Sequence, residues 1–170
     1  MKDELVILVD LQDNMVGTME KLKAHQRGYL HRAFSIFIFN DHDELLLQRR
    51  AHHKYHSGGL WTNTCCSHPR PEESIEVASH RRLMEEMGFD CELMNAFSFV
   101  YKADCSNGLI EHELDHVYIG RYDLNPRTNP TEVAEWKYMG IPSIQKDLLK
   151  NPSVYTEWFK ISFNKVVNSI

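Results

Sequence analysis

Short apolar runs separated by turn-forming residues dominate the first part of the chain and predict β-strands. The strongest run covers residues 32–40, which are rich in Phe and Ile. Residues 40–43 are typical of a turn and 45–48 return as another strand, so a hairpin is expected. Further strands are predicted at 4–9, 16–20 and 61–65, with a short helical or irregular piece at 21–25.

One helix occupies the centre of the chain. It is predicted to begin near Pro71, because proline and acidic residues favour the first turn, and to run to about Met87 before stopping at Gly88. Later strands are predicted at 91–102, 110–122 and 135–139, and later helices at 143–150 and 153–167. Strands that flank one helix, with more helices at the end, favour a mixed α/β (α+β) sandwich over a regular βαβ repeat.

The central helix has two unlike sides when its residues are placed at ~100° intervals. Apolar residues occupy one side, which is predicted to face the core: Val77, Met84 and Met87. Charged residues occupy the other side: Arg82, Glu85 and Glu86. The charged side has two interpretations, a solvated surface with ion pairs four residues apart or a site for a charged ligand.

Length and composition fit a single domain that spans residues 1–170. Hydrophobic residues make up 42% of the chain and charged residues 25%, which excludes a disordered or low-complexity chain. The formal net charge of -5 argues against a nucleic-acid-binding surface. No apolar run approaches the roughly 18 residues that a membrane helix requires. The 4 cysteines have no framework spacing and the N-terminus has no leader pattern, so a reducing, cytoplasmic setting is expected.

Two carboxylates and three histidines are candidates for a metal centre. Glu111 and Glu113 are two residues apart in a predicted strand, so both point to one face, where their like charges require a cation or a shared proton. With His25, His31 and His68 they would form a nitrogen–oxygen site suited to Mn²⁺, Zn²⁺ or Mg²⁺. The alternative is that a histidine is an ordinary surface or hydrogen-bonded residue. That alternative is assigned to His42, His52, His53, His56, His80, His112 and His116.

Residues of the central helix match the Nudix box, a loop–helix–loop that holds a divalent cation against a diphosphate. The matching residues are Glu73, Arg81, Leu83, Glu85, Glu86, Gly88 and Phe89. Ser67 stands in place of the leading glycine, and Arg82 in place of the first glutamate of the metal-binding helix. An arginine removes a metal ligand and repels a cation, but it can bind phosphate. The helix is therefore expected to bind a diphosphate without hydrolysing it.

The chain resembles the type I isopentenyl diphosphate isomerases over nearly its whole length. The motifs that carry the resemblance include Gly17-Thr18-Met19-Glu20-Lys21, Arg49-Arg50-Ala51, Trp61-Thr62-Asn63, Cys66-x-His68-Pro69, Tyr101-Lys102-Ala103 and Glu111-x-Glu113. The resemblance implies a Nudix-type mixed β-sheet sandwiched between helices. It also implies an isomerase of isoprenoid biosynthesis that interconverts isopentenyl and dimethylallyl diphosphate through a tertiary carbocation. The partner would be this small molecule, with no nucleic acid and no membrane, and the protein a monomer or weak homodimer.

The resemblance further implies roles for individual residues. Cys66 and Glu113 would be the acid/base pair on opposite faces of the substrate, with Tyr101 hydrogen-bonded to Glu113. Glu113 is favoured as the proton donor toward dimethylallyl diphosphate. One divalent metal would be held by His25, His31, His68, Glu111 and Glu113. Glu86 would hold Mg²⁺ on the diphosphate. The cations that grip the diphosphate would be Lys21, Arg50, Lys54 and Arg82, and the residues that line the pocket Trp61 and Trp158.

Two other functions are compatible with parts of the sequence. A Nudix diphosphate hydrolase would share the fold but would want a glutamate at the position of Arg82. A non-enzymatic metal-binding module could use Cys65, Cys66 and His68, and would bind metal tightly without turnover.

Overall fold

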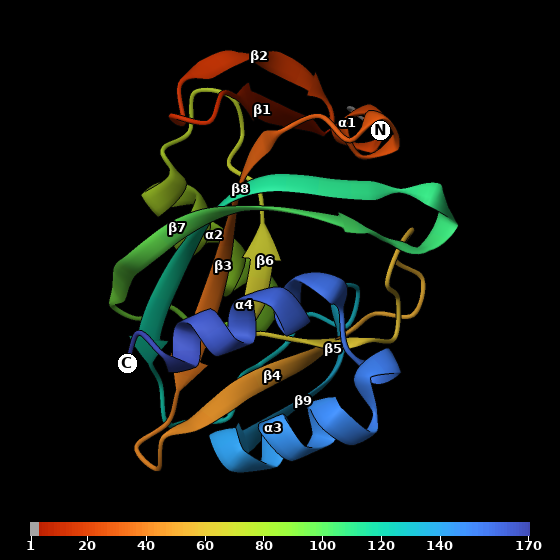
Figure 1. Cartoon of the computed structure of the whole chain (residues 1–170). Helices are drawn as coiled ribbons and strands as arrows, with labels where there is room; N and C mark the ends of the chain where they lie inside the picture. Colours follow the sequence, from red (N-terminus) through yellow and green to blue (C-terminus); the bar gives the residue numbers. More distant parts are fainter. Residues whose placement is uncertain (1–3) are drawn as a thin grey trace.

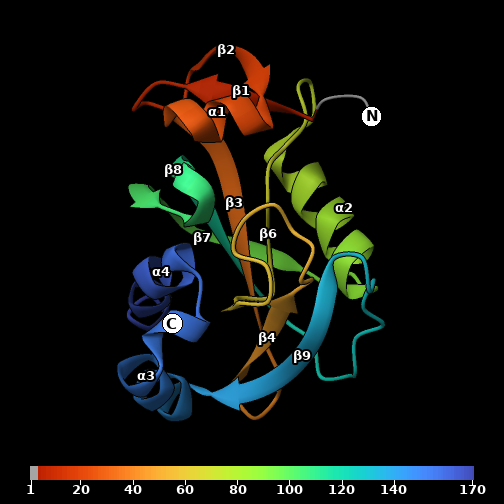
Figure 2. The ribbon, with the colours of Figure 1, turned by 90° about the vertical axis from the view of Figure 1, so that its right-hand side faces the viewer.

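The computed structural model describes residues 4–170 and contains a nine-stranded sheet with helices on both faces (Figures 1 and 2). The strands are β1 (Leu5–Val9), β2 (Met15–Glu20), β3 (His31–Phe39), β4 (Glu44–Arg50), β5 (Trp61–Thr62), β6 (Cys65–Ser67), β7 (Leu93–Asp104), β8 (Ile110–Arg121) and β9 (Val133–Gly140). The helices are α1 (Lys21–Arg27), α2 (Ile75–Met87), α3 (Ile141–Lys150) and α4 (Glu157–Val167), with 3₁₀ turns η1 (Ser106–Gly108) and η2 (Pro152–Val154). The predicted mixed sheet between helices is confirmed.

Strand β3 lies at the centre of the sheet, and most of its side chains are apolar and buried. β8 runs parallel to it along its whole length, while β1, β4 and β6 pair with it antiparallel. Ile36 and Ile38 contribute to the core on one face, and Phe37 and Phe39 to the core on the other. A strand that is buried on both faces has a continuous apolar sequence. This burial explains why residues 32–40 gave the strongest strand signal.

Each face of the sheet has its own hydrophobic core, and helices cover both. On one face, Leu83 and Met87 of α2 pack against the isoleucines of β3. On the other, Phe159 and Phe163 of α4 pack against the phenylalanines of β3, with α3 beside them. Figure 2 shows α2 on one side of the sheet and α3 and α4 on the opposite side.

Two strand predictions are corrected by long-range pairing. Within residues 4–170, β3 and β4 pair only where Phe39 meets Leu45, beside the turn, and β4 continues along β5 and β9. The single strand predicted at 61–65 is split, because β5 pairs with β4 whereas β6 crosses to β3. Between them, buried Asn63 and Thr64 donate hydrogen bonds to backbone carbonyls of β3 and β4. The split places β6 directly against β3.

Two helices begin later than the sequence predicts. α2 starts at Ile75 instead of near Pro71, because the Ser74 hydroxyl accepts a backbone N–H of the first turn and caps the helix. The last helix starts at Glu157 for the same reason: Thr156 accepts a hydrogen bond from a first-turn N–H. The η2 turn occupies the beginning of the segment that was predicted to be helical.

The predicted core-facing side of α2 is wrong. Val77 and Met84 are 58% and 51% exposed, and only Met87 of the three apolar residues is buried. The buried side of the helix is the one that includes Ala78, Leu83 and Glu86. The apolar pattern misleads here because α2 faces both a hydrophobic core and a polar pocket, so a carboxylate occupies part of its buried side.

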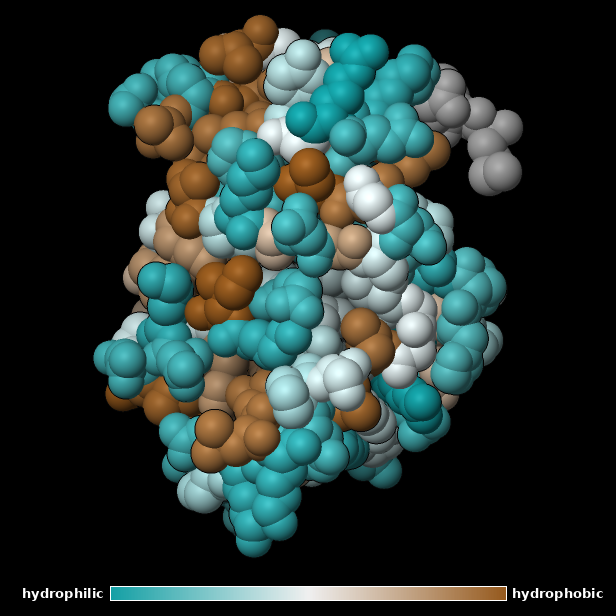
Figure 3. Space-filling view, turned by 45° about the vertical axis from the view of Figure 1, so that its right-hand side comes forward, coloured by the Kyte–Doolittle hydropathy of each residue, from teal (hydrophilic) through white to brown (hydrophobic). Residues whose placement is uncertain are grey.

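Among residues 4–170, no helix is both long enough and apolar enough to cross a membrane. On the face shown in Figure 3, apolar side chains form several separate groups among polar ones.

Candidate active site

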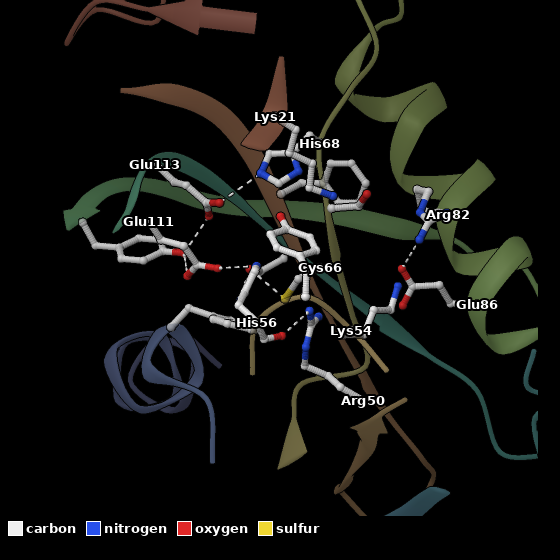
Figure 4. A pocket seen from close by; sticks show the side chains of 16 residues that line it. Lys21, Arg50, Lys54, His56, Cys66, His68, Arg82, Glu86, Glu111 and Glu113 are labelled. Atoms are coloured by element: carbon white, nitrogen blue, oxygen red, sulfur yellow. Dashed lines mark hydrogen bonds and ion pairs between the residues drawn. The ribbon is translucent and has the colours of Figure 1, made fainter. Parts of the chain in front are cut away.

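A pocket lies over β3, between residues of α1, α2, β8 and α4 (Figure 4). The predicted site residues that line it are Lys21, Arg50, Lys54, Cys66, His68, Arg82, Glu86, Tyr101, Glu111, Glu113 and Trp158. His25 and His31 are fully buried behind it, against Glu113. Trp61 does not line the pocket: its ring packs against the α4 core, with Nζ of Lys137 4.2 Å from its centre. The structure thus brings together most of the predicted site.

Three histidines converge on one oxygen of Glu113. The distances from Glu113 Oε1 are 3.0 Å to His68 Nε2, 3.4 Å to His31 Nε2 and 3.9 Å to His25 Nε2. The four residues come from α1, the start of β3, the segment after β6, and β8. Ligand atoms from all four lie within 4.8 Å of one another. Three imidazoles and a carboxylate in one small volume are a donor set for a borderline divalent metal.

The orientation of the imidazoles supports this fit. The Nδ1–H of His31 donates to the carbonyl of Tyr29 at 2.8 Å, so its Nε2 carries the lone pair that faces Glu113. Nδ1 of His25 is 3.2 Å from the hydroxyl of Tyr55. The Nε2 atoms of His25 and His31 are buried and make no hydrogen bond within the described residues. A bound cation would satisfy both of these atoms.

Glu111 stands apart from this group of four. Its Oε2 is 3.1 Å from the hydroxyl of Tyr101, which donates to Oε2 of Glu113 at 2.6 Å. The other oxygen of Glu111 is 3.8 Å from Nε2 of His56. The hydroxyl of Tyr101 therefore bridges the two carboxylates, while Glu111 itself faces a different histidine.

The two carboxylates have opposite electrostatic surroundings. Burial alone would raise the pKa of Glu113, but His25, His31 and His68 hold it well below its usual range. Burial and the charge of Glu113 raise the pKa of Glu111 well above its usual range. Burial also lowers the pKa of His68 to about 4, so its imidazole is neutral at pH 7. A carboxylate beside the neutral imidazole of His68 is a protonation state that suits metal binding.

Cys66 lines the same pocket as Glu113, from β6 on the other side of β3. Its thiol donates to Oδ1 of Asn63 at 3.0 Å and contacts Oγ of Ser35 at 3.4 Å. The Ser35 hydroxyl donates to the buried carboxyl of Asp115 at 2.8 Å. Burial raises the pKa of the Cys66 thiol, so this sulfur keeps its proton at neutral pH.

Cys65, the neighbouring residue, points to the opposite face of the sheet. Successive side chains of a strand alternate, and Cys65 is completely buried in the core beneath α2. Cys65 packs in this core beside Glu86 of α2, whereas Cys66 faces the pocket with Ser35 and Asn63, so the two adjacent thiols lie on opposite faces of the sheet.

Cationic side chains line the α2 end of the pocket. Arg82 contacts Glu86 at 2.5 Å, and Gln48 donates to the other oxygen of Glu86 at 2.8 Å. Lys54 pairs with Glu132, which is also 3.4 Å from Arg82. Two further cations lie near Trp158 and α1: Arg50, 5.2 Å from the centre of the indole, and Lys21. The result is a positively charged wall on which one carboxylate, Glu86, is embedded.

Several residues of the site were missed by the sequence analysis. His56 was assigned to the ordinary surface or hydrogen-bonded histidines, yet it is buried and lines the pocket. No local pattern marks it, because only the folding of the 51–60 loop brings it inward. Asp115 had a usable signal: it continues the alternation of Glu111 and Glu113 on the same face of β8. Ser35 and Asn63, which contact Cys66, are buried polar residues in strand-like sequence that also carried no chemical signature.

The fold has known relatives. Residues 29–159 match the NUDIX domain family. Among solved structures, DR0079 from Deinococcus radiodurans superposes with a TM-score of 0.78 at 16% identity, covering 95% of this chain and 98% of that one. The MutT NUDIX hydrolase from Burkholderia pseudomallei gives a TM-score of 0.63 at 20% identity, covering 81% of this chain and 98% of that chain. These likenesses define the class of fold.

Closer relatives define the family within that class. Isopentenyl-diphosphate Delta-isomerase 2 of Aromatoleum aromaticum is 54% identical over 98% of this chain and 88% of its own length. The isopentenyl-diphosphate Delta-isomerase of Pectobacterium atrosepticum is 50% identical over 95% of this chain and 90% of its own. The chain belongs to the Nudix family and, within it, to the isopentenyl-diphosphate Delta-isomerases.

Proposed function

We propose that this chain is an isopentenyl-diphosphate Delta-isomerase that interconverts isopentenyl and dimethylallyl diphosphate in the pocket of Figure 4. The observation that carries the assignment to the pocket is that Cys66 and Glu113, from the two strands that flank β3, line one cavity together with Lys21, Arg50, Lys54 and Arg82. A 1,3-shift of a double bond needs one proton added and another removed, while the diphosphate of the substrate, bound by the cations, holds the substrate in place.

The chemistry requires two proton-transfer groups. A proton is added to C4 of the alkene, which leaves a tertiary carbocation at C3, and the loss of a proton from C2 then forms the new double bond. The neutral thiol of Cys66 and the ionised carboxylate of Glu113 supply one acid and one base. Because the reaction is reversible, both groups work in both directions.

The pocket also has groups that suit the carbocation. The indole of Trp158 lines the pocket, and an aromatic face stabilises a cation by about 0.5–2 kcal/mol. Tyr101 positions Glu113 through its short hydrogen bond. Trp61 lies outside the lining, so we assign it to packing beneath Lys137 instead of substrate contact.

Two divalent metals complete the proposal. His25, His31, His68 and Glu113 would hold Mn²⁺, Zn²⁺ or Mg²⁺. Glu111, which shares the hydroxyl of Tyr101 with Glu113, would be the fifth ligand. This ion would fix the position and basicity of Glu113. Glu86 would hold Mg²⁺ on the diphosphate, with Lys21, Arg50, Lys54 and Arg82 around the phosphate oxygens.

The alternative, diphosphate hydrolysis, is disfavoured by α2 itself. A Nudix hydrolase requires a metal-binding carboxylate at the position of Arg82. In this chain the Arg82 guanidinium instead donates a hydrogen bond to Oε1 of Glu86. Isomerisation is tested by incubating the purified chain with isopentenyl diphosphate and following the acid-labile dimethylallyl product, in Mg²⁺ alone and with added Mn²⁺ or Zn²⁺. Phosphate release from nucleoside diphosphates is measured alongside. Phosphate release without isomerisation would reverse the assignment.

We further propose that residues 1–170 act as one Nudix-fold isomerase domain, as a monomer or weak homodimer. Residues 1–3 lie outside the described part of this domain. The four cysteines are free thiols, which is compatible with a reducing, cytoplasmic setting.

A further inference from the structure

A second group of metal-ligating side chains borders the pocket, beside the four-residue cluster. It consists of His56, Cys105 and Glu111, whose ligand atoms all lie within 4.8 Å of one another. His56 Nε2 is 3.8 Å from Glu111 Oε1. His56 and Glu111 are buried, whereas Cys105 is partly exposed. An ion from solvent could therefore enter the site beside the Cys105 side chain.

Two loops hold these residues together. His56 lies in the loop between β4 and β5, and Cys105 begins the turn between β7 and β8. The backbone N–H of Ser57 donates to Oγ of Ser106 at 3.1 Å, and Nδ2 of Asn107 donates to the carbonyl of Tyr55 at 2.9 Å. These hydrogen bonds join the residues on both sides of His56 to the residues that follow Cys105. The site is therefore preformed by contacts that do not involve its own ligand atoms.

The orientation of His56 favours coordination. Its Nδ1 is 3.3 Å from Oγ of Ser57, and its Nε2 faces Glu111. A tetrahedral zinc ion with Zn–N, Zn–O and Zn–S bonds of about 2.0–2.3 Å separates its ligand atoms by roughly 3.3–3.6 Å. A movement of about 1 Å by rotation of the side chains would bring the three atoms to these separations.

The charges of the group also suit a divalent cation. When a divalent ion displaces their protons, Cys105 and Glu111 would supply two negative charges beside the imidazole of His56. Arg50, whose Nη2 lies 3.3 Å from the carbonyl of His56, is the neighbouring cation that opposes binding. The sulfur distinguishes this group from the cluster around Glu113, which offers only nitrogen and oxygen, and it favours zinc over magnesium or manganese.

We propose that His56, Cys105 and Glu111 form a second, zinc-binding site that withdraws Glu111 from the metal cluster of the active site. Three protein ligands leave the fourth position of a tetrahedral ion open to water. Oε1 of Glu111 faces His56 while its Oε2 faces the hydroxyl of Tyr101, so zinc bound at Oε1 would hold the carboxylate on the His56 side. This competition, but not the zinc site itself, rests on the proposed function.

The test is a cobalt titration of the full chain after treatment with a chelator. Cobalt bound to a thiolate has an intense near-ultraviolet absorption band, which a centre of imidazoles and carboxylates lacks. The wild type should develop this band, and zinc should abolish it by displacing cobalt. The variant C105S should lack the band, and H56Q should raise the cobalt concentration at half-saturation by about tenfold or more. The variant C91S, which removes a thiol on another part of the surface, should retain the band.

Each outcome decides the proposal. Absence of the band in the wild type at saturating cobalt would overturn the site, and so would a band that persists in C105S or disappears only in C66S. Competition for Glu111 is tested by a separate measurement, the inhibition of isomerisation by excess zinc. If zinc withdraws Glu111, it should inhibit the wild type more strongly than C105S. Equal zinc inhibition of the two would overturn the competition. A chain without isomerase activity would overturn the proposed function and leave the cobalt result valid.

Discussion

Nη2 of Arg82 lies 2.5 Å from Oε1 of Glu86, one helical turn away on α2. The pair brings together the residue that departs from the Nudix box and the carboxylate predicted to hold Mg²⁺. Neighbouring Glu85 and Glu132 also contact this guanidinium. Their charges hold the pKa of Arg82 above its usual range, despite its burial, so the arginine remains a cation on the pocket wall.

The variant R82E should abolish most isomerase activity. It removes the proposed contact to the diphosphate, and a hydrogen bond to a charged group contributes about 1.5–3 kcal/mol, so we expect kcat/KM to fall by about 10–100-fold from this loss alone. The negative charge placed beside Glu86 should lower it further. Isomerisation and phosphate release are measured together. R82K, which keeps the charge, is the control and should retain more activity. Full activity in R82E would mean that Arg82 is only an ion-pair partner of Glu86.

The variants C66A and C65A should differ sharply. Cys66 faces the pocket, and loss of a proton-transfer group lowers kcat by about 10²–10⁴-fold. Cys65 is buried beneath α2, so C65A should leave kcat nearly unchanged and lower the thermal midpoint. Steady-state kinetics and thermal melts separate the two effects. Exchanged phenotypes would show that the register of β6 is wrong.

The variant Y101F should lower kcat with little change in KM. The hydroxyl positions Glu113 and lies between both carboxylates, yet it does not extend to the diphosphate end of the pocket. Loss of one hydrogen bond to a charged group predicts a decrease of about 10–100-fold. If KM rose and kcat did not change, Tyr101 would act in binding instead. A thermal melt of Y101F controls for unfolding.

Removal of metal should loosen α1 selectively. His25 and His31 are buried with unsatisfied Nε2 atoms, and they connect α1 and the start of β3 to Glu113 on β8. Chelation should abolish activity and accelerate proteolysis of residues 21–32, while α2 stays protected. H25A should reproduce the loosening without chelator, and H80A, on the surface of α2, should not. Equal cleavage with and without chelator would exclude His25 and His31 as ligands.

Glu73 should make stability depend on pH. Hydrogen bonds from Arg81, at 2.7 and 2.8 Å, lower the pKa of Glu73. A carboxyl whose pKa is lower in the folded state stabilises the protein above its unfolded pKa of about 4.3, and this contribution is lost as pH falls through the folded value. E73Q should therefore lower the thermal midpoint at pH 7 by a few degrees, and the difference should vanish in strong acid. A difference that is constant with pH would assign the effect to packing.

Features that depend on residues close in the chain were predictable from the sequence. The continuous apolar run of β3 predicted the strongest strand of the chain. Gly88 ended α2 as expected: its φ is 73°, and a Cβ there would lie 2.2 Å from the carbonyl oxygen of Arg127. The spacing of Glu111 and Glu113 placed both on one face of β8, and the helix spacing identified the Nudix box.

Tertiary structure decided the features that depend on contacts between distant segments. The apolar pattern of α2 predicted a core-facing side that includes Val77, but Val77 is exposed and Glu86, beside the polar pocket, is buried. Nothing local marked His56, because its burial depends on hydrogen bonds from a turn some fifty residues later, formed by Ser106 and Asn107. Helical and strand periodicity define which side chains share a face, since backbone geometry repeats along the chain. Periodicity does not define what packs against that face, because the opposing surface is formed by residues distant in the sequence.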